Sequence, residues 1–241
     1  MSYGDIVGRL LKVMTNEGHS RLEYMANSPQ SASGWMGLIE KFLHSKQANN
    51  ATGGQLGNLG ALAGALLSGG TAAAKGALGG SALSMLEALA INALQKKLGA
   101  QSSDLQEGRL ADSLPKEQVE IMSTSDTEKL ILCAMISAAK ADGQLDQHEM
   151  GKILGKVSED GITDNEHQFI RDELNRPLDL NKLVSSVPNQ VVATQVYAAS
   201  LFALDIDTEA EKDYLRQLAQ ALNLNSDSVK MLHEMTGSPI V

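Results

Sequence analysis

Two long apolar segments in the second half of the chain each run into an acidic turn. The first reads MISAAKADGQLDQHEMGKIL and the second reads VYAASLFALDIDTEAEKDYL. Apolar residues recur at helical spacing on both sides of each turn, which predicts a buried helix, a turn and an amphipathic helix. Asp142 matches Asp205, and Glu149 matches Glu211 if the second turn is one residue shorter. The pattern predicts an all-α domain of two pseudo-symmetric helical repeats, with the two acidic turns close together.

The composition supports a helical core. Hydrophobic residues make up 43% of the 241 residues, whereas aromatic residues make up 3%. A core built mainly from Leu, Ile, Val, Met and Ala favours packed helices over sheets. The single cysteine, Cys133, lies in the apolar run LILCAMISAA, so we expect a small core residue rather than a reactive thiol. One cysteine also fits a reducing compartment.

Changes in composition predict four parts of the chain, with the boundaries 1–48, 49–100, 101–124 and 125–241. The first part contains two expected amphipathic helices, near 4–16 and 34–46. The second is rich in Gly and Ala and ends in a stronger helical pattern over 81–98. The third is polar and is expected to be a linker. The fourth is expected to be a compact helical domain.

The Gly/Ala-rich segment 49–100 has three open interpretations. It is long enough to cross a bilayer, but Asn58, Ser68 and several glycines dilute its leucines. It also suits a flexible, partly helical linker, or a self-association surface where small residues four apart allow close helix contact. The first residues of the chain lack the basic and apolar regions of a secretory signal peptide.

The charge is unevenly distributed along the chain. Residues 1–100 have a balance of +3, whereas residues 101–241 have a balance of −12. An acidic surface repels phosphate, so nucleic acid is not expected as a partner. The acidic half instead favours cations or basic protein surfaces.

Several helix starts are expected within residues 125–241. A cap residue followed three positions later by glutamate predicts capping boxes at Ser125 and Glu128, Asp146 and Glu149, Thr163 and Glu166, and Thr208 and Glu211. Pro188 suits the first position of a further helix. Capping therefore explains the second half of each acidic turn without any ligand.

Asp142 and Asp205 are harder to explain by local structure. Each follows a long apolar helix, whose C-terminal end disfavours an anion by roughly 0.3–1 kcal/mol. Two copies of this locally unfavourable choice predict a nearby cation. Hard oxygen ligands for Ca²⁺, Mg²⁺ or Mn²⁺ would come from Asp142, Glu149, Asp205 and Glu211. Additional candidate ligands are Asp146, Asp207 and Glu209. Neither turn has the residue pattern of an EF-hand loop.

The motif Ala-Asp-Gly-x-Leu-Asp-x-x-Glu at 141–149 and its partner at 205–215 resemble the TerB-like (tellurite resistance) domain family. With the Gly/Ala-rich stretch before them, they are similar to the DUF533 proteins, which include bacterial inner-membrane proteins. The resemblance implies an all-helical domain whose acidic residues from both repeats surround a divalent-cation site. It also implies a link to metal stress, in the bacterial cytoplasm or at the inner membrane, and no catalytic activity. This chain departs from the pattern by having Ile206 where the first copy has a glycine.

Three functions remain open from the sequence. The first is a non-enzymatic helical module that binds a divalent cation or a protein partner, with the N-terminal half tethering it to the inner membrane or joining it to other copies. The second is a purely structural homo-oligomeric assembly protein, in which the acidic turns are only helix caps. The third, a metal-dependent hydrolase, would need an open coordination position and a pocket, and no motif indicates either.

Overall fold

The computed structural model of the chain describes residues 3–13, positions 83, 85–87, 89–91 and 93–94, and residues 116–143 and 162–241. Within these residues the chain forms helices and no strand, as expected for an all-α protein. The elements are α1 (Tyr3–Val13), α7 (Lys116–Glu120), η3 (Ile121–Ser123), α8 (Ser125–Ala139), α10 (Asp164–Asn175), α11 (Leu180–Ser185), α12 (Gln190–Phe202), α13 (Glu209–Ala221) and α14 (Ser226–Thr236). The described helical positions between 83 and 94 are called the 83–94 segment.

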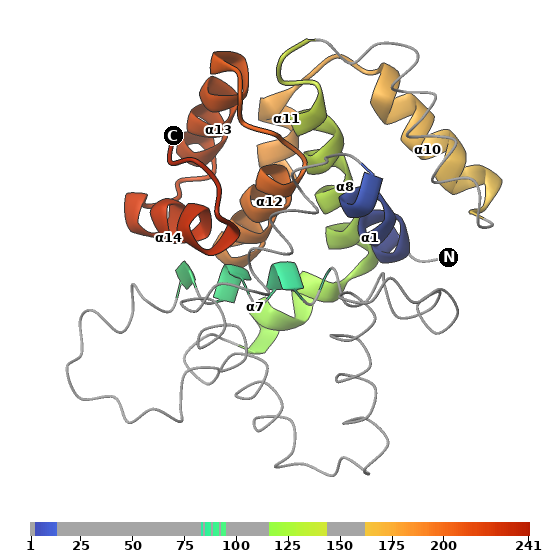
Figure 1. The fold of residues 1–241 in the computed structure, drawn as a ribbon. Coiled ribbons are helices and arrows are strands. Elements are labelled where there is room, and N and C mark those ends of the chain that lie inside the picture. The colour runs from blue at the N-terminus through green and yellow to red at the C-terminus, as the bar shows by residue number, and fades with distance from the viewer. Residues whose placement is uncertain are drawn as a thin grey trace, which may run out of the picture.

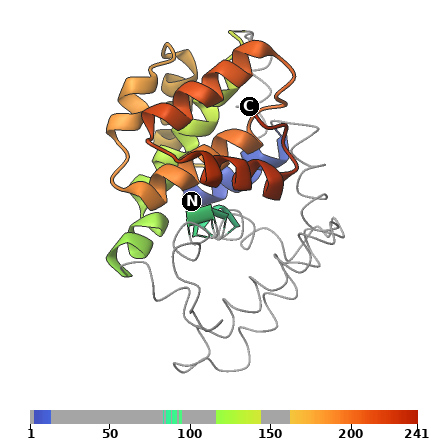
Figure 2. The same ribbon diagram turned by 90° about the vertical axis from the view of Figure 1, so that its left-hand side faces the viewer.

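The two apolar helices α8 and α12 form the centre of the molecule. They pack on each other more extensively than any other pair of described elements. Every residue from Val191 to Phe202 in α12 is buried, because this helix is apolar on nearly all sides and must be covered on all of them. Figure 1 shows α13 and α14 on one side of this pair and α1 and α10 on the other. Figure 2 faces the side that carries α13 and α14.

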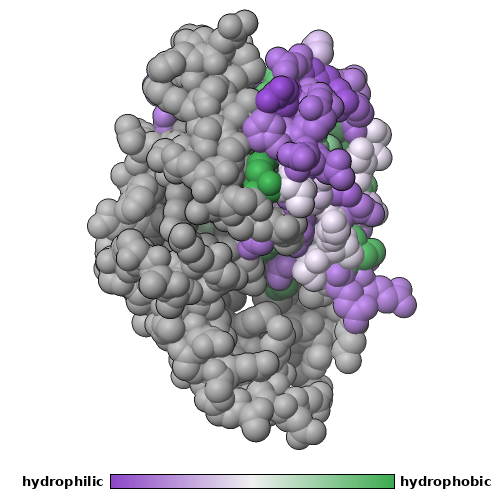
Figure 3. Space-filling model, turned by 90° about the vertical axis from the view of Figure 1, so that its right-hand side faces the viewer, coloured by the Kyte–Doolittle hydropathy of each residue, from purple (hydrophilic) through white to green (hydrophobic). Residues whose placement is uncertain are grey.

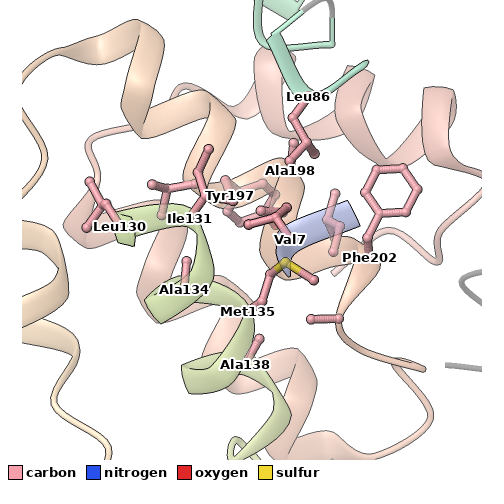
Figure 4. Packing of buried hydrophobic residues seen from close by; sticks show 14 of the residues in the cluster. Val7, Leu86, Leu130, Ile131, Ala134, Met135, Ala138, Tyr197, Ala198 and Phe202 are labelled. Atoms are coloured by element: carbon pink, nitrogen blue, oxygen red, sulfur yellow. The ribbon is translucent and has the colours of Figure 1, made fainter. Parts of the chain in front are cut away.

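The N-terminal part of the chain contributes to the same core. Ile6, Val7 and Leu10 of α1 are completely buried, and Leu86 and Leu89 of the 83–94 segment are as well. Figure 4 shows side chains from α1, the 83–94 segment, α8 and α12 converging in one hydrophobic cluster. The helix expected near 4–16 is confirmed as α1, whereas the one expected near 34–46 lies outside the described residues. The core therefore extends beyond the predicted compact domain.

Two of the predicted capping boxes are confirmed. Thr163 and Thr208 each accept a hydrogen bond from the amide of the glutamate three residues later, which in turn accepts from the cap residue's own amide. The box predicted at Asp146 and Glu149 lies outside the described residues. These caps form as predicted because they depend only on residues within one helical turn.

Two other predicted helix starts are wrong by one or two residues. Thr124, not Ser125, is the N-cap of α8, and its side chain accepts from the amide of Thr127. The carboxylate of Glu128 is directed elsewhere and accepts from the distant amide of Gly4. Pro188 is not the first residue of α12, because Asn189 follows it as the N-cap.

The described surface is largely hydrophilic. Large hydrophobic side chains are exposed at Leu178 and Ile240 among the residues that the structure describes. In the space-filling view of the side that carries α10, the coloured atoms are mostly hydrophilic, with small hydrophobic areas between them (Figure 3). None of the described helices is both long and apolar enough to cross a membrane.

Candidate functional site

The acidic turn between α12 and α13 contains a residue in an unfavourable backbone conformation. Helix α12 ends at Phe202, and Ile206 has a φ of 58°, in the left-handed region. Side chains branched at Cβ rarely adopt this region, and the cost is roughly 1–2 kcal/mol. The Ile206 side chain is only 3% exposed. Its burial in the core therefore offsets the backbone strain.

The first acidic turn also has a positive φ at the matching position. Gly143 follows Asp142 with a φ of 71°, just as Ile206 follows Asp205 with a φ of 58°. Glycine adopts this conformation at little cost. The replacement of glycine by isoleucine in the second copy therefore leaves the left-handed turn intact. This agreement supports the correspondence of the two turns, while the twofold packing of the repeats stays a prediction.

Glu211 acts as a structural cap within the second turn. Its Oε2 atom accepts hydrogen bonds from the Asp207 amide at 3.1 Å, the Thr208 amide at 3.0 Å and the Thr208 hydroxyl at 2.9 Å. Burial would raise the pKa of Glu211, but these hydrogen bonds outweigh it and lower the pKa below its usual value. Glu211 is therefore held as a carboxylate, with one oxygen fully engaged by the turn.

The other candidate ligands in the second turn differ in environment. Asp205 is half-buried and its Oδ1 atom is inaccessible to solvent. Asp207 and Glu209 are exposed, and Glu209 forms an ion pair of 2.7 Å with Lys212 along α13. Asp205 and Glu211 are therefore the two less exposed acidic residues of this turn.

The described residues do not by themselves assemble a metal site. In the part of the chain that the structure describes, no three His, Cys, Asp or Glu side chains are grouped closely enough to hold one ion. Asp142 is half-buried at the end of the first turn, whereas Asp146 and Glu149 lie outside the described residues. The four-carboxylate site stays a prediction, and Glu211 is additionally found to have a capping role.

A groove between α8, α10 and α11 was not anticipated from the sequence. It encloses about 260 Å³ and has Leu130, Cys133, Phe169 and Leu183 among its lining residues. At one end the Lys140 ammonium donates to the backbone carbonyl oxygens of Glu173 and Arg176, the latter at 2.7 Å. Lys140 thereby satisfies carbonyl groups at the C-terminal end of α10. The only sequence signal is a lysine at the end of an otherwise apolar helix.

Cys133 lines this groove but is not activated by it. Burial raises the pKa of its thiol to about 12, and the charge of Glu173 acts in the same direction. The thiolate, which is the nucleophilic form, is therefore strongly disfavoured at neutral pH. This environment agrees with the expected role of Cys133 as a packing residue.

A buried polar contact joins α12 to α14. The Tyr197 hydroxyl and the His233 Nε2 atom are 2.9 Å apart, and both residues are completely inaccessible to solvent. Burial raises the pKa of Tyr197 well above its usual value, so the hydroxyl stays protonated. Sequence patterns do not reveal this pair, because the residues lie on different helices, 36 positions apart.

Comparison with known proteins places these features in a family. Residues 50–236 match DUF533, described as "Protein of unknown function (DUF533)". The chain is also 28% identical over 97 residues to the "Uncharacterized protein in ampR 5'region" of Yersinia enterocolitica, covering 40% of this chain and 70% of that protein. No solved structure matches the chain. Since the match spans both acidic turns, the core helices α8 and α12 and the Gly/Ala-rich segment, the chain belongs to DUF533, a TerB-like family.

Proposed function

We propose that this chain is a non-catalytic TerB-like helical module that binds a divalent cation at its two acidic turns. Asp142 and Asp205 would be the central ligands. The observation that carries the proposal is the left-handed backbone that follows both aspartates, at Gly143 and at Ile206. Strained residues persist where their surroundings determine the conformation, and they are frequent at functional sites.

The remaining ligands follow from the geometry of the second turn. Because Oε2 of Glu211 already accepts three hydrogen bonds, Oε1 would be the atom that faces a cation. Asp207 would provide a further oxygen, whereas Glu209 is directed along α13 toward Lys212. Glu149 would complete the set from the first turn, with Asp146 as an additional ligand. Carboxylates of this kind suit Ca²⁺, Mg²⁺ or Mn²⁺.

Calorimetry on the full-length chain tests this proposal. Each of the three cations is titrated into the wild type, the Asp142→Asn/Asp205→Asn double variant and an Asp213→Asn control. Asp213 is an exposed carboxylate of α13 that pairs with Arg216 at 2.6 Å and is not among the proposed ligands, so its variant should keep the wild-type heat. The double variant should lose it. Absence of binding heat for all three cations in the wild type would reject cation binding.

A second candidate function is favoured by the capping role of Glu211. In a purely structural homo-oligomeric protein the acidic turns would only start helices, and the hydrogen bonds at Thr208 are sufficient for that role. Sedimentation velocity separates this candidate from the first. An oligomeric wild type that binds no cation supports assembly alone, whereas a monomer that binds a cation supports the first function.

Under either function, the Gly/Ala-rich segment would determine where in the cell the protein acts. The family match begins at residue 50, so this segment belongs to the same family unit as the helical core. We place the chain in the bacterial cytoplasm, with attachment to the inner membrane through residues 49–100. Flotation with vesicles of bacterial lipids tests the attachment. The wild type should float, and Leu62→Asp/Leu66→Asp should not. A wild type that stays with the soluble fraction would reject attachment.

A further inference from the structure

Helix α1 lies in a seat made by three elements that come much later in the chain. The seat comprises Leu83 of the 83–94 segment, Glu128 and Lys129 of α8 and Phe169 of α10, and we call it the α1 seat. Figure 1 shows α1 against α8 on the side of the molecule that also carries α10. Among the described elements, only α12 packs more extensively on α8 than α1 does.

The α1 seat leaves little room for a side chain at one position of the helix. A Cβ atom on Gly4 would lie 2.4 Å from Cδ1 of Leu83 and 3.0 Å from Oε1 of Glu128. Both atoms end flexible side chains that would have to move, so we expect a side chain as large as leucine not to fit. The Gly4 amide also donates to Oε2 of Glu128 at 3.1 Å, which satisfies an N–H group of the first turn of α1.

Aromatic contacts fix the outer end of α1. The Tyr3 ring meets the Phe169 ring edge-on, with centroids 5.4 Å apart and an interplanar angle of 76°. The Lys129 ammonium lies 5.1 Å from the centre of the Tyr3 ring, within the range of a cation–π contact. These contacts define one orientation of α1 on α8 and α10.

The connection to this seat is long. Residues 14–82 separate α1 from Leu83, and Gly4 is 124 positions from Glu128. At full extension residues 14–82 would span about 230 Å, far more than the diameter of a domain of this size. No short loop therefore obliges α1 to occupy the seat of its own chain, and every contact of the seat is available to an identical helix from another chain.

We propose that the α1 seat also accepts α1 of a second copy, so that two chains exchange N-terminal helices in a symmetric dimer. Exchange of an identical element preserves its native contacts and is a low-cost route to dimers. A linked helix is held near its own seat at an effective concentration on the order of mM or less. Exchange in the wild type therefore becomes appreciable when chains are concentrated to that range. The proposal does not depend on cation binding.

Complementary variants test the exchange at lower concentrations. Gly4→Leu gives a chain whose α1 does not fit but whose seat is intact. Glu128→Arg gives a chain with a normal α1 but a seat that repels the Gly4 amide. At a concentration where the wild type is monomeric, each variant alone should sediment as a monomer. An equimolar mixture should sediment as a 1:1 dimer.

The matched control replaces the first chain with a Gly4→Leu/Glu128→Arg double variant. Its seat is closed, so its mixture with Glu128→Arg should stay monomeric. Circular dichroism establishes that Gly4→Leu keeps its helical signal, and Gly4→Val takes its place if it does not. A peptide of residues 1–13 with a fluorescent label should also bind the Gly4 variant and not the double variant. If a folded Gly4 variant binds neither the peptide nor the Glu128→Arg chain, exchange is rejected. If the wild type is oligomeric through another surface, each single variant on its own should keep that oligomeric state. Such assembly is thereby distinguished from the exchange of α1.

Discussion

Tyr197 and His233 join α12 to α14 through a hydrogen bond of 2.9 Å in the interior of the molecule. Removal of the hydroxyl leaves a polar ring nitrogen without this partner in a site that is closed to water. Tyr197→Phe should therefore lower the free energy of unfolding by about 1–3 kcal/mol, as measured by urea denaturation.

Tyr214 provides the matched control for this prediction. It is also buried, but among the described residues its hydroxyl has no hydrogen bond of normal geometry, only a looser interaction with the Ser200 side chain. Tyr214→Phe should leave the stability unchanged or raise it slightly, because the desolvation of the hydroxyl is no longer required. Equal losses in the two variants would contradict the assigned role of the Tyr197–His233 contact.

The strained turn at Ile206 is tested by a pair of variants. Ile206→Ala removes a buried side chain but keeps a Cβ atom, and it should cost about 2–4 kcal/mol. Ile206→Gly removes the same packing but relieves the left-handed backbone, so it should be more stable than the alanine variant by about 1 kcal/mol. In ordinary backbone the order is reversed, because glycine has the larger conformational entropy when unfolded. Thermal unfolding of both variants gives the order directly.

The capping role of Glu211 predicts a stability that depends on pH. Its folded-state pKa is lowered, so its carboxylate stabilises the fold above the unfolded-state pKa of about 4.3. This contribution is lost as the pH falls through the lower folded-state pKa. Glu211→Ala should cost about 1 kcal/mol at pH 7, and the difference from wild type should shrink toward pH 3.

Glu209→Ala is the corresponding control. Glu209 begins the same helix, is exposed and pairs with Lys212 at the surface. Loss of an exposed ion pair of this kind should cost less than about 0.5 kcal/mol. Denaturation of both variants at several pH values compares them, and a gap between Glu211→Ala and wild type that stays constant down to pH 3 would argue against the carboxylate as the cap.

Gln195 predicts a stabilising substitution. Its side chain is completely buried in α12, and neither of its polar atoms has a hydrogen-bond partner among the described residues. Gln195→Leu has a similar volume and removes the desolvation cost, so it should raise the free energy of unfolding by about 1–3 kcal/mol.

Thr194→Val is the control for Gln195→Leu, because it also replaces a polar side chain with an apolar one at the neighbouring position. The Thr194 hydroxyl donates to the carbonyl oxygen of Gln190 at 2.9 Å, so its removal relieves no unsatisfied group. This variant should show no such gain in urea denaturation. A loss of stability in Gln195→Leu, or the same gain in both variants, would show that the amide of Gln195 is not the source of the cost.

The sequence was informative wherever structure depends on neighbouring residues. The apolar character of the segments that became α8 and α12 predicted central helices, since a helix that is apolar on all sides must be covered. The caps at Thr163 and Thr208 were predicted because a capping box involves only four consecutive positions.

Tertiary contacts explain the predictions that were wrong or missing. At the start of α8, Thr124 competes with Ser125 as the cap, and Glu128 accepts from Gly4, which lies 124 positions earlier in the chain. The left-handed conformation of Ile206 opposes its intrinsic preference and is maintained by burial in the core. The Tyr197–His233 contact depends on how two helices cross, which no periodicity within one helix specifies.

The position of α1 in the core has a consequence for synthesis on the ribosome. Tyr3 is made before its aromatic partner Phe169, which follows more than 160 residues later. At synthesis rates of about 5–20 residues per second, this delay is roughly 10–30 s. Until α8 has been made, the apolar face of α1, with Ile6, Val7 and Leu10, lacks the helix on which it mainly packs. The nascent chain is therefore expected to need shielding of this apolar helix near the ribosomal exit until α8 has emerged, and the contact with α10 completes its placement later.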